Sequence, residues 1–580
     1  MSAKDRNAKK AEEKAKGFRK IAYLCRHIIA ITPNDDTITH TKNNNNIMKK
    51  MNLFLAAAAF SMGALAEVNY QVVPLPQTIQ LDESGKTTAL IKGQTVGYPA
   101  DNAQMKRNAE FAREYLGLIP QAYEKKAKGL AVTLSLGLKS ENPDAYCITV
   151  DKKGVTIQGA SESGVFYGIQ TLRKSVANEQ TDTIALPWAT VAAEPRFEYR
   201  GCMLDCARHY FPTAFIKTYI DILALHGINK FHWHLTDDQG WRFEVRGLPD
   251  LAKKGSYRPH TIVGNNVGLW DADNTIYDDT PEEGYYTQAE IKELVAYAAE
   301  RYITIIPEID LPGHMVAALS VYPELGCTGG PYFVRPYWGV DPDVLCAGNP
   351  KTMEFIKKVL GEICEVFPSK FIHIGGDESP RDRWKACPKC QAKMKELGLT
   401  KEAQLQTYIN KEVEKFLQER GRELIGWDET LEGGLSENAT VMSWRGYKGG
   451  IEAAKQHHRV IMTPTDNCYI DYYQLKNQHA QPKAIGGYLP LSKVYDMEPV
   501  PAELTEEEGK YILGAQCNLW TEYVVSPDHV EYMLLPRLAA ISEVQWLQKD
   551  QKDFEQFTGR LEGLKKTYRK LGYKFCTSQE

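Results

Sequence analysis

The run FIHIGGDE, residues Phe371–Glu378, places two carboxylates side by side at the end of an apolar, strand-like segment. Adjacent residues on a regular strand face opposite sides, so Asp377 and Glu378 can share one cleft only where the strand opens into a loop. Gly375 and Gly376 permit such a loop. Two neighbouring acids repel, so one of them tends to keep its proton near neutral pH, as a general acid must. An isolated pair of this kind is more often a solvated cap at the start of a helix, so the surrounding elements have to decide.

Eight strand-like segments occur in the C-terminal two thirds of the chain, and polar or aromatic residues fall at their ends. Stretches with helical periodicity separate most of them, at Thr287–Arg301, Lys351–Phe367, Gln404–Gly421 and Ile451–His457. This alternation predicts an α/β fold, a (β/α)8 TIM barrel with its active site at the C-terminal ends of the strands. The predicted strands are Tyr199–Asp205, Lys230–Asp237, Tyr302–Asp310, Phe371–Glu378, Glu423–Glu429, Thr440–Arg445, Arg459–Thr463 and Tyr511–Glu522.

Eight motifs in and after these segments carry a specific resemblance. In chain order they are RGCMLDCARH, HWHLTDDQGWR, PEIDLPGH, HIGGDE, GWDE, SWRG, YIDYYQ and QCNLWTE. From roughly Ala145 to the C-terminus the chain resembles glycoside hydrolase family 20, the β-N-acetylhexosaminidases. The resemblance implies a catalytic barrel preceded by a small α/β domain with an antiparallel sheet, no cofactor, and a glycan substrate with a terminal N-acetylhexosamine. It also implies an exo-acting retaining enzyme in which the substrate's own acetamido group is the nucleophile.

The resemblance assigns catalytic roles to five residues. Glu378 would protonate the leaving-group oxygen, Asp377 would hold the 2-acetamido group, and Tyr469 would donate a hydrogen bond to the acetamido oxygen. Asp237 and His314 would lie behind Glu378 and tune it. Because the acetamido oxygen is tethered near the anomeric carbon, its attack has a high effective molarity. An enzyme nucleophile is then unnecessary.

Six further residues match positions that bind the terminal sugar. Charged groups at the sugar hydroxyls give directional recognition, and a hydroxyl that is held in this way cannot carry a continuing chain, which predicts a blind pocket. Tyr488 is expected to replace an aromatic residue that many relatives carry, and linkage preference is expected to depend on loops such as Thr328–Gly348. The walls would be Trp427, Trp444 and Trp520, and the hydroxyl ligands would be Arg208, Asp471 and Glu522.

Two alternatives use the same barrel. His232 and His234 face one side of a strand, and an HxH pair of this kind begins the metal site of metal-dependent amidohydrolases. Asp237, His314 and His373 could complete a zinc hydrolase, although the family motif accounts for HWH without metal and the tryptophans would have no role. A barrel that binds sugars without cleaving them would need a lost catalytic residue, and no matched position is lost.

The cysteines are not dense enough for a disulfide scaffold. Of the twelve, only Cys387 and Cys390, in Cys-Pro-Lys-Cys, have suggestive spacing. A zinc ribbon would require a second such pair, and the sequence has none. We therefore expect no metal, and either a local disulfide or two free thiols in an exported protein.

The N-terminal part of the chain predicts export. Residues 48–66 have a basic start, a short apolar run and an Ala-Leu-Ala end, which are typical of a signal peptide cleaved after Ala66. The run is too short to cross a membrane, so the mature form is expected to have no membrane span and to be periplasmic or secreted. Residues 1–47 would then be a disordered or non-native extension. A net charge of −4 gives no reason to expect a nucleic-acid partner.

Residues 67–190 are predicted to form the small accessory domain, and residues 195–580 the barrel. The accessory domain would contain helices at Asn102–Leu116 and Gly164–Val176 and a strand at Gly129–Leu136. A hairpin is expected to turn at residues 152–154. We expect no catalytic residue from this domain.

Overall fold

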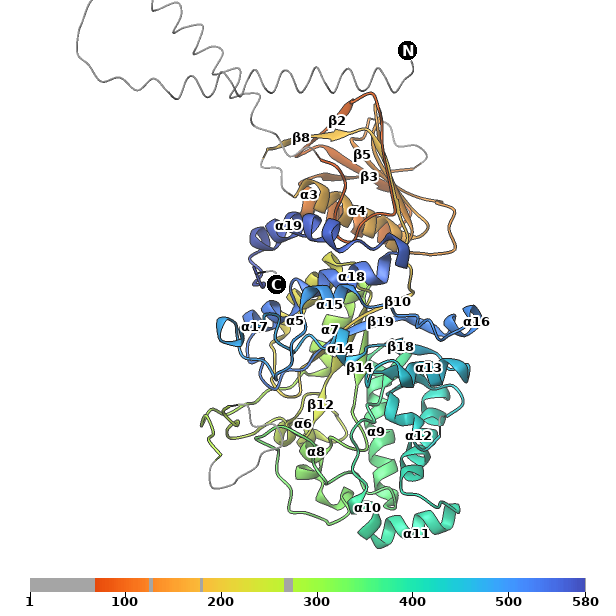
Figure 1. Ribbon diagram of the computed structural model, residues 1–580, viewed down its shortest axis with the longest axis vertical. Helices are drawn as coiled ribbons and strands as arrows, with labels where there is room; N and C mark the ends of the chain where they lie inside the picture. Colours follow the sequence, from red (N-terminus) through yellow and green to blue (C-terminus); the bar gives the residue numbers. More distant parts are fainter. Residues whose placement is uncertain (1–67, 125–128, 178–180, 265–274, 435, 579–580) are drawn as a thin grey trace, which may run out of the picture. The chain divides into compact units, whose positions relative to one another are not determined.

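The computed structural model describes residues 68–124, 129–177, 181–264, 275–434 and 436–578 (Figure 1). The predicted extension 1–47 and signal peptide 48–66 lie outside these residues. No helix within the described ranges is both long enough and apolar enough to span a membrane.

The small domain is built on a seven-stranded sheet in the order β1-β9-β6-β7-β5-β3-β4. Strands β1, β9, β6 and β7 pair antiparallel, as expected, whereas β7, β5, β3 and β4 pair parallel. The predicted hairpin is present, because Asp151 of β6 pairs with Gly154 of β7. The helices are α3 (Ala103–Leu116) and α4 (Glu162–Val176), and the strands are β1 (Thr78–Leu81), β3 (Thr95–Pro99), β4 (Ile119–Tyr123), β5 (Val132–Leu136), β6 (Tyr146–Asp151), β7 (Gly154–Gly159) and β9 (Ala189–Ala193), with β2 (Thr87–Ile91) and β8 (Thr183–Pro187) forming a separate antiparallel pair.

Eight parallel strands close into a barrel, which confirms the predicted fold class. All seven residues of the first strand are buried, as expected for a strand covered on both faces. Six buried residues on the barrel strands form a hydrophobic cluster: Tyr199, Ile306, Ile425, Trp427, Met442 and Ile461. The strands are β10 (Tyr199–Asp205), β11 (Lys230–His234), β14 (Thr304–Glu308), β15 (Phe371–His373), β16 (Glu423–Trp427), β17 (Thr440–Ser443), β18 (Val460–Met462) and β19 (Ile512–Leu519).

Most of these strands end earlier than the sequence predicts. Strand β15 stops at His373, five residues short of Glu378, and β11 stops at His234 rather than Asp237. The residues with chemical potential therefore lie in the loops that follow the strands. Loops can direct adjacent side chains into one cavity, which a regular strand cannot do.

The four predicted helices are present with slightly different ends. They are α7 (Gln288–Ala299), α9 (Pro350–Val366), α12 (Ala403–Gln418) and α13 (Lys448–Lys455). Helix α9 begins with Pro350 behind an Asn349 cap, whose side chain accepts a hydrogen bond from the backbone N–H of Lys351 at 3.2 Å. Helix α7 begins with a capping box between Thr287 and Glu290.

Buried Arg200, at the start of β10, joins the barrel to the small domain. Its guanidinium donates to Asp144 Oδ2 at 2.6 Å and to the hydroxyl of Tyr167 at 3.1 Å, both in the small domain. It also donates to the carbonyl oxygens of Gly227 at 2.8 Å and Phe197 at 3.0 Å. Every nitrogen of this buried cation is thus engaged.

Candidate active site

A cavity of about 410 Å³ lies at the C-terminal ends of the barrel strands. It collects residues from widely separated parts of the chain, because all eight strands deliver their following loops to this end. Ten of the eleven predicted site residues line it: Arg208, His314, Asp377, Glu378, Trp427, Trp444, Tyr469, Asp471, Trp520 and Glu522.

The backbone after β15 turns both acidic side chains into this cavity. Gly375 and Gly376 have φ values of +64° and +96°, and Glu378 itself has a φ of +43°. The Asp310 carboxylate fixes the turn by accepting a hydrogen bond from the N–H of Gly376 at 3.0 Å. A Cβ on Gly375 would lie 1.8 Å from that carboxylate, so only glycine fits there. The left-handed conformation at Glu378 is unfavourable for a residue with a side chain, and such strain concentrates at functional sites.

His314 lies between the acidic pair and Asp237. Its Nδ1 is 3.0 Å from Asp237 Oδ1, and its Nε2 is 3.8 Å from Asp377 Oδ2 and 3.7 Å from Glu378 Oε2. Burial alone would lower the pKa of His314, but the carboxylate of Asp237, together with Asp310 and Asp377, raises it well above its usual value. The positively charged form of His314 is therefore favoured by its surroundings, and its Nε2 atom faces the two acids. Asp237, the eleventh predicted residue, does not line the cavity. Its contact with Nδ1 positions the His314 ring.

Glu378 has the properties that a general acid needs. Burial raises the pKa of its carboxyl group, His314 opposes that shift, and the neighbouring Asp377 adds to it. The side chain nevertheless remains 43% exposed, so it can reach a leaving group at the mouth of the cavity. Asp377 is more enclosed, and its Oδ1 atom has no hydrogen-bond partner within the described parts of the chain.

Three carboxylates surround Arg208. Its guanidinium lies 2.8 Å from Asp237 Oδ2, 3.2 Å from Asp205 Oδ2 and 3.9 Å from Glu522 Oε1. The contact with Glu522 is too long for a direct hydrogen bond, which leaves that carboxylate available to a ligand. Burial raises the pKa of Glu522, whereas Arg208 lowers it.

Asp471 is buried on the same side of the cavity. Burial, with a further contribution from Glu522, raises the pKa of Asp471 well above its usual value. Its Oδ1 atom makes no hydrogen bond to any described residue. A buried polar atom without a partner is costly, and a polar ligand in the cavity would relieve that cost.

Aromatic rings form the walls of the cavity. Trp444 stacks on Tyr469 with ring centroids 6.1 Å apart and an interplanar angle of 26°, and Trp427 lies 6.0 Å from Trp520. Two of these rings are held by hydrogen bonds, because Trp427 Nε1 donates to Glu308 Oε1 and Trp444 Nε1 donates to a buried glutamate, Glu429 Oε2, both at 3.0 Å. Burial raises the pKa of the Tyr469 hydroxyl well above its usual value, so it stays a proton donor.

The structure adds residues that sequence reasoning did not assign. Burial and the charge of Asp377 raise the pKa of Glu429 to about 8, and its position in the GWDE motif was the available signal. Trp338, from the loop between β14 and α9, also lines the cavity, but no pattern in its surroundings pointed to it. Tyr488 does not line the cavity, where Ile485 lies instead. The lining of this cavity therefore gives no support to the expected aromatic replacement by Tyr488.

The histidines of the zinc alternative converge on Glu308 inside the barrel. His232 Nε2 and His234 Nδ1 lie 2.9 Å and 2.5 Å from its Oε2 atom, and His373 Nδ1 lies 3.0 Å from its Oε1 atom. Burial would raise the pKa of Glu308, but the three histidines hold it well below its usual value. A metal on His232, Glu308 and His373 would have to break these contacts. Glu308 also accepts the hydrogen bond from Trp427 Nε1, so this arrangement holds the indole ring of Trp427 in place.

A larger hollow, of about 940 Å³, lies at the opposite ends of the strands. It is lined by residues that begin strands, such as Lys230, Thr304 and Phe371, and by Arg200 and Asp144 of the interface with the small domain. Barrel enzymes have their catalytic residues at the C-terminal face of the barrel, whereas residues at the N-terminal face usually contribute to stability. The smaller cavity, with its unpaired carboxylates, is the candidate active site.

Comparison with known proteins agrees with this placement. Residues 197–549 match the family model described as glycosyl hydrolase family 20, catalytic domain, and residues 69–192 match glycosyl hydrolase family 20, domain 2. The chain is 42% identical over 503 residues to a beta-hexosaminidase of Porphyromonas gingivalis, covering 85% of this chain and 62% of the relative. It is 38% identical over 404 residues to a beta-hexosaminidase of Vibrio furnissii, covering 69% of this chain and 64% of the relative. The chain thus spans less than two thirds of the length of these two proteins.

A solved structure of a family 20 enzyme also matches this chain. The exo beta-N-acetylglucosaminidase of Vibrio harveyi, solved in complex with N-acetylglucosamine, superimposes with a TM-score of 0.75 at 30% identity. The match covers 88% of this chain and 79% of that one. The family model for the catalytic domain covers more than half of the chain and contains all eleven candidate residues. The chain therefore belongs to glycosyl hydrolase family 20.

Proposed function

We propose that this protein is an exo-acting, retaining β-N-acetylhexosaminidase that removes terminal non-reducing GlcNAc or GalNAc from glycans. The observation that carries the proposal is the pair Asp377 and Glu378, turned by a left-handed backbone into one aromatic-walled cavity beside His314. One carboxylate is partly exposed with a raised pKa, and the other has an unpaired oxygen. The two acids are therefore equipped for different tasks.

In the first step, Glu378 donates its proton to the glycosidic oxygen while the C1–O bond breaks. The acetamido oxygen of the same sugar forms a bond to C1 and closes an oxazolinium ring, whose positive charge lies next to Asp377. The unpaired Oδ1 of Asp377 would accept a hydrogen bond from the acetamido N–H, and the Tyr469 hydroxyl would donate to the acetamido oxygen. These two contacts orient the nucleophile and stabilise the developing charge.

In the second step, the ionised Glu378 takes a proton from water as the water oxygen attacks C1 and opens the ring. Two successive inversions at C1 retain the β configuration. The same residue serves first as acid and then as base, as microscopic reversibility requires.

The polar end of the cavity supports exo action. Arg208 and Asp471 are buried and Glu522 is half-buried, the Asp471 Oδ1 atom has no hydrogen-bond partner among the described residues, and the hydroxyls of a terminal sugar would supply further partners. A hydroxyl that is held by such a group cannot carry the next sugar of a chain. Mismatch at one such position costs a few kcal/mol, because a charged partner is left unpaired.

Two substrate comparisons test the proposal. An aryl β-N-acetylglucosaminide should be hydrolysed with the β-anomer as the first product seen by NMR, and the matching β-glucoside without the acetamide should be essentially inert. A cyclic thiazoline analogue of the intermediate should inhibit. Release of the α-anomer first, or comparable turnover of the glucoside, would contradict the mechanism.

A chitin oligomer tests the exo assignment separately. Steady release of the monosaccharide from the start of digestion is expected from a blind pocket. Early appearance of disaccharides or internal fragments would show an open cleft and would remove the assigned role of Arg208, Asp471 and Glu522.

A further inference from the structure

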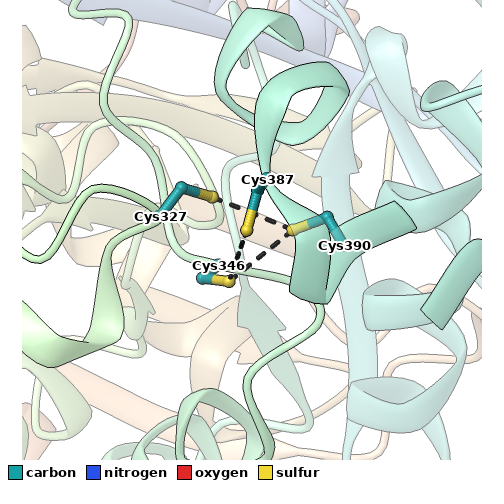
Figure 2. A group of neighbouring side chains, drawn as sticks. All are labelled: Cys327, Cys346, Cys387 and Cys390. Carbon is teal, nitrogen blue, oxygen red and sulfur yellow. Dashed lines mark hydrogen bonds between the residues drawn. The ribbon is translucent and has the colours of Figure 1, made fainter. Parts of the chain in front are cut away.

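Four cysteines from three separate segments of the barrel domain meet in one cluster (Figure 2). The Sγ atom of Cys346 lies 3.7 Å from that of Cys387 and 3.6 Å from that of Cys390, and Cys327 Sγ lies 3.8 Å from Cys390 Sγ. All four sulfur atoms lie within 4.8 Å of one another. Three of the cysteines are buried and Cys327 is half-buried. The sequence argued against a metal because it has no second Cys-x-x-Cys pair. In the structure Cys327 and Cys346, which are not close in sequence to each other, take the place of that pair.

The sulfur separations match the edges of a metal–thiolate tetrahedron. Zinc binds cysteine sulfur at about 2.3 Å in tetrahedral sites, which places the sulfur atoms about 3.8 Å apart. A disulfide would bring two sulfurs to about 2.05 Å and would pair each sulfur with only one other. Here Cys346 and Cys390 each approach two sulfurs at similar distances. The arrangement is that of four ligands around one centre.

The backbone around the first two cysteines is built to hold them together. Gly326 and Leu345 form an antiparallel bridge, and the N–H of Cys346 donates to the carbonyl oxygen of Leu325 at 2.8 Å. The carbonyl oxygen of Cys346 in turn accepts a hydrogen bond from the Thr352 hydroxyl at 2.9 Å, in the first turn of α9. The residues that precede both cysteines are therefore paired with each other, and the backbone of Cys346 is bonded through both its N–H and its carbonyl oxygen.

The other two cysteines are brought in by an equally close approach. A Cβ on Gly348 would lie 2.1 Å from the carbonyl oxygen of Lys389 and 2.5 Å from the backbone nitrogen of Cys390, so this position excludes a side chain. Trp384 Nε1 donates to the carbonyl oxygen of Leu345 at 2.9 Å. Cys387 is the N-cap of α11 (Pro388–Leu397), where the helix dipole favours negatively charged sulfur.

We propose that Cys327, Cys346, Cys387 and Cys390 bind one structural Zn²⁺ ion as thiolates. A set of four protein sulfurs leaves no open coordination position, so the ion would not take part in catalysis. Four soft thiolates in tetrahedral geometry select zinc over the hard cations that prefer oxygen. Each thiol loses its proton to solvent on binding, and no oxidant or reductant is required.

The ion would brace two walls of the candidate active site. Cys327 and Cys346 belong to the loop between β14 and α9, which also carries Trp338 and Val340 of the cavity lining. Cys387 and Cys390 belong to the segment after β15, which begins with the Asp377–Glu378 turn. The zinc would tie the loop of one wall to the segment that carries both acids. This inference does not depend on the proposed reaction, because metal content is measured without substrate.

Metal analysis of the purified full-length chain, without a polyhistidine tag, is the first test. One zinc per chain is expected, together with release of that zinc by a thiol-blocking mercurial and an intact mass in which all four cysteines are reduced. Two disulfides among these cysteines, the outcome that the predicted export favours, would overturn the proposal. Four free thiols without metal, or iron in place of zinc, would also overturn it.

Variants locate the ion. Cys346→Ser should lose the zinc and lower the melting temperature, whereas Cys364→Ser, a control at a half-buried cysteine outside the cluster, should keep the zinc. Zinc that persists at one ion per chain in Cys346→Ser would contradict the proposal. If Cys346→Ser does not fold, cobalt exchange into the wild type decides the question. A sulfur-to-cobalt charge-transfer band is expected, and a cobalt spectrum without thiolate ligation would exclude the site.

Discussion

Strand β10 has a buried arginine at each end, and the two arginines have opposite kinds of surroundings. Arg200, at the N-terminal end, meets one carboxylate, one hydroxyl and two carbonyl oxygens, all within 3.1 Å. Arg208, just beyond the C-terminal end, donates to Gln239 Oε1 at 2.9 Å and lies near three carboxylates, one of them as far away as 3.9 Å. Every nitrogen of both guanidinium groups has a partner in the protein, but at the Arg208 end the carboxylates that line the cavity retain unused hydrogen-bonding capacity.

This difference separates a structural junction from a binding site. Burying a charge is tolerable when its partners are complete, and removing one partner then costs stability. At the C-terminal end the protein leaves carboxylate oxygens of Asp377 and Asp471 without partners, although such atoms are expensive to bury. A polar ligand that forms hydrogen bonds to those oxygens would offset the free-energy cost of burying them. Substitutions at the two ends should therefore have different consequences.

The largest effect is expected for Asp377→Asn. Its free oxygen is placed to act on the charge that develops during the reaction, so turnover should fall by roughly 10²–10³-fold with little change in KM. Steady-state kinetics on an aryl β-N-acetylglucosaminide measure both constants, and an unchanged melting temperature is the control. A raised KM with normal turnover would make Asp377 a simple binding residue.

A matched pair of lysine substitutions tests the comparison itself. Arg208→Lys keeps the charge but loses the planar fork, and should lower kcat/KM by about 10–100-fold through lost charge-assisted hydrogen bonds. Arg200→Lys loses the same fork at the saturated end, and should lower the free energy of unfolding by about 1–3 kcal/mol while the folded protein keeps its kcat/KM. Chemical denaturation measures the free energy of unfolding of both variants, and steady-state kinetics measure kcat/KM of both. Loss of activity in Arg200→Lys with unchanged stability would remove the distinction.

The sequence was sufficient for the barrel because each strand and helix has strong local signals. Motif order located the residues of the cavity, and ten of them do line it. The predicted strand ends were too late, because residues such as Asp377 and Glu378 follow the apolar run directly in the sequence although the backbone leaves the sheet after His373. Trp338 and the meeting of Cys327 with Cys390 could not be foreseen, since both depend on the path of a long loop. Loop paths follow from tertiary packing rather than from local pattern.

A smaller effect is expected in the pH profile of Asp377→Asn. The negative charge of Asp377 contributes to the raised pKa of Glu378, after burial, so removing it should let Glu378 lose its proton at lower pH. The basic limb of kcat/KM should therefore move to lower pH with a substrate whose leaving group needs a proton. With an activated aryl leaving group this limb should be weak in both proteins. A basic limb that stays in place or moves to higher pH would mean that another group controls it.

The most direct test of the central claim compares two leaving groups in Glu378→Gln. If Glu378 protonates the glycosidic oxygen, this variant should lose orders of magnitude in turnover on N,N′-diacetylchitobiose, called chitobiose below, and far less on an aryl β-N-acetylglucosaminide whose phenolate departs without a proton. The ratio of the two losses is the measured quantity, and it is independent of the fraction of folded protein. A much larger loss on chitobiose is the predicted result. Equal losses on both substrates would contradict the assignment of Glu378 as the acid, and with it the proposed mechanism.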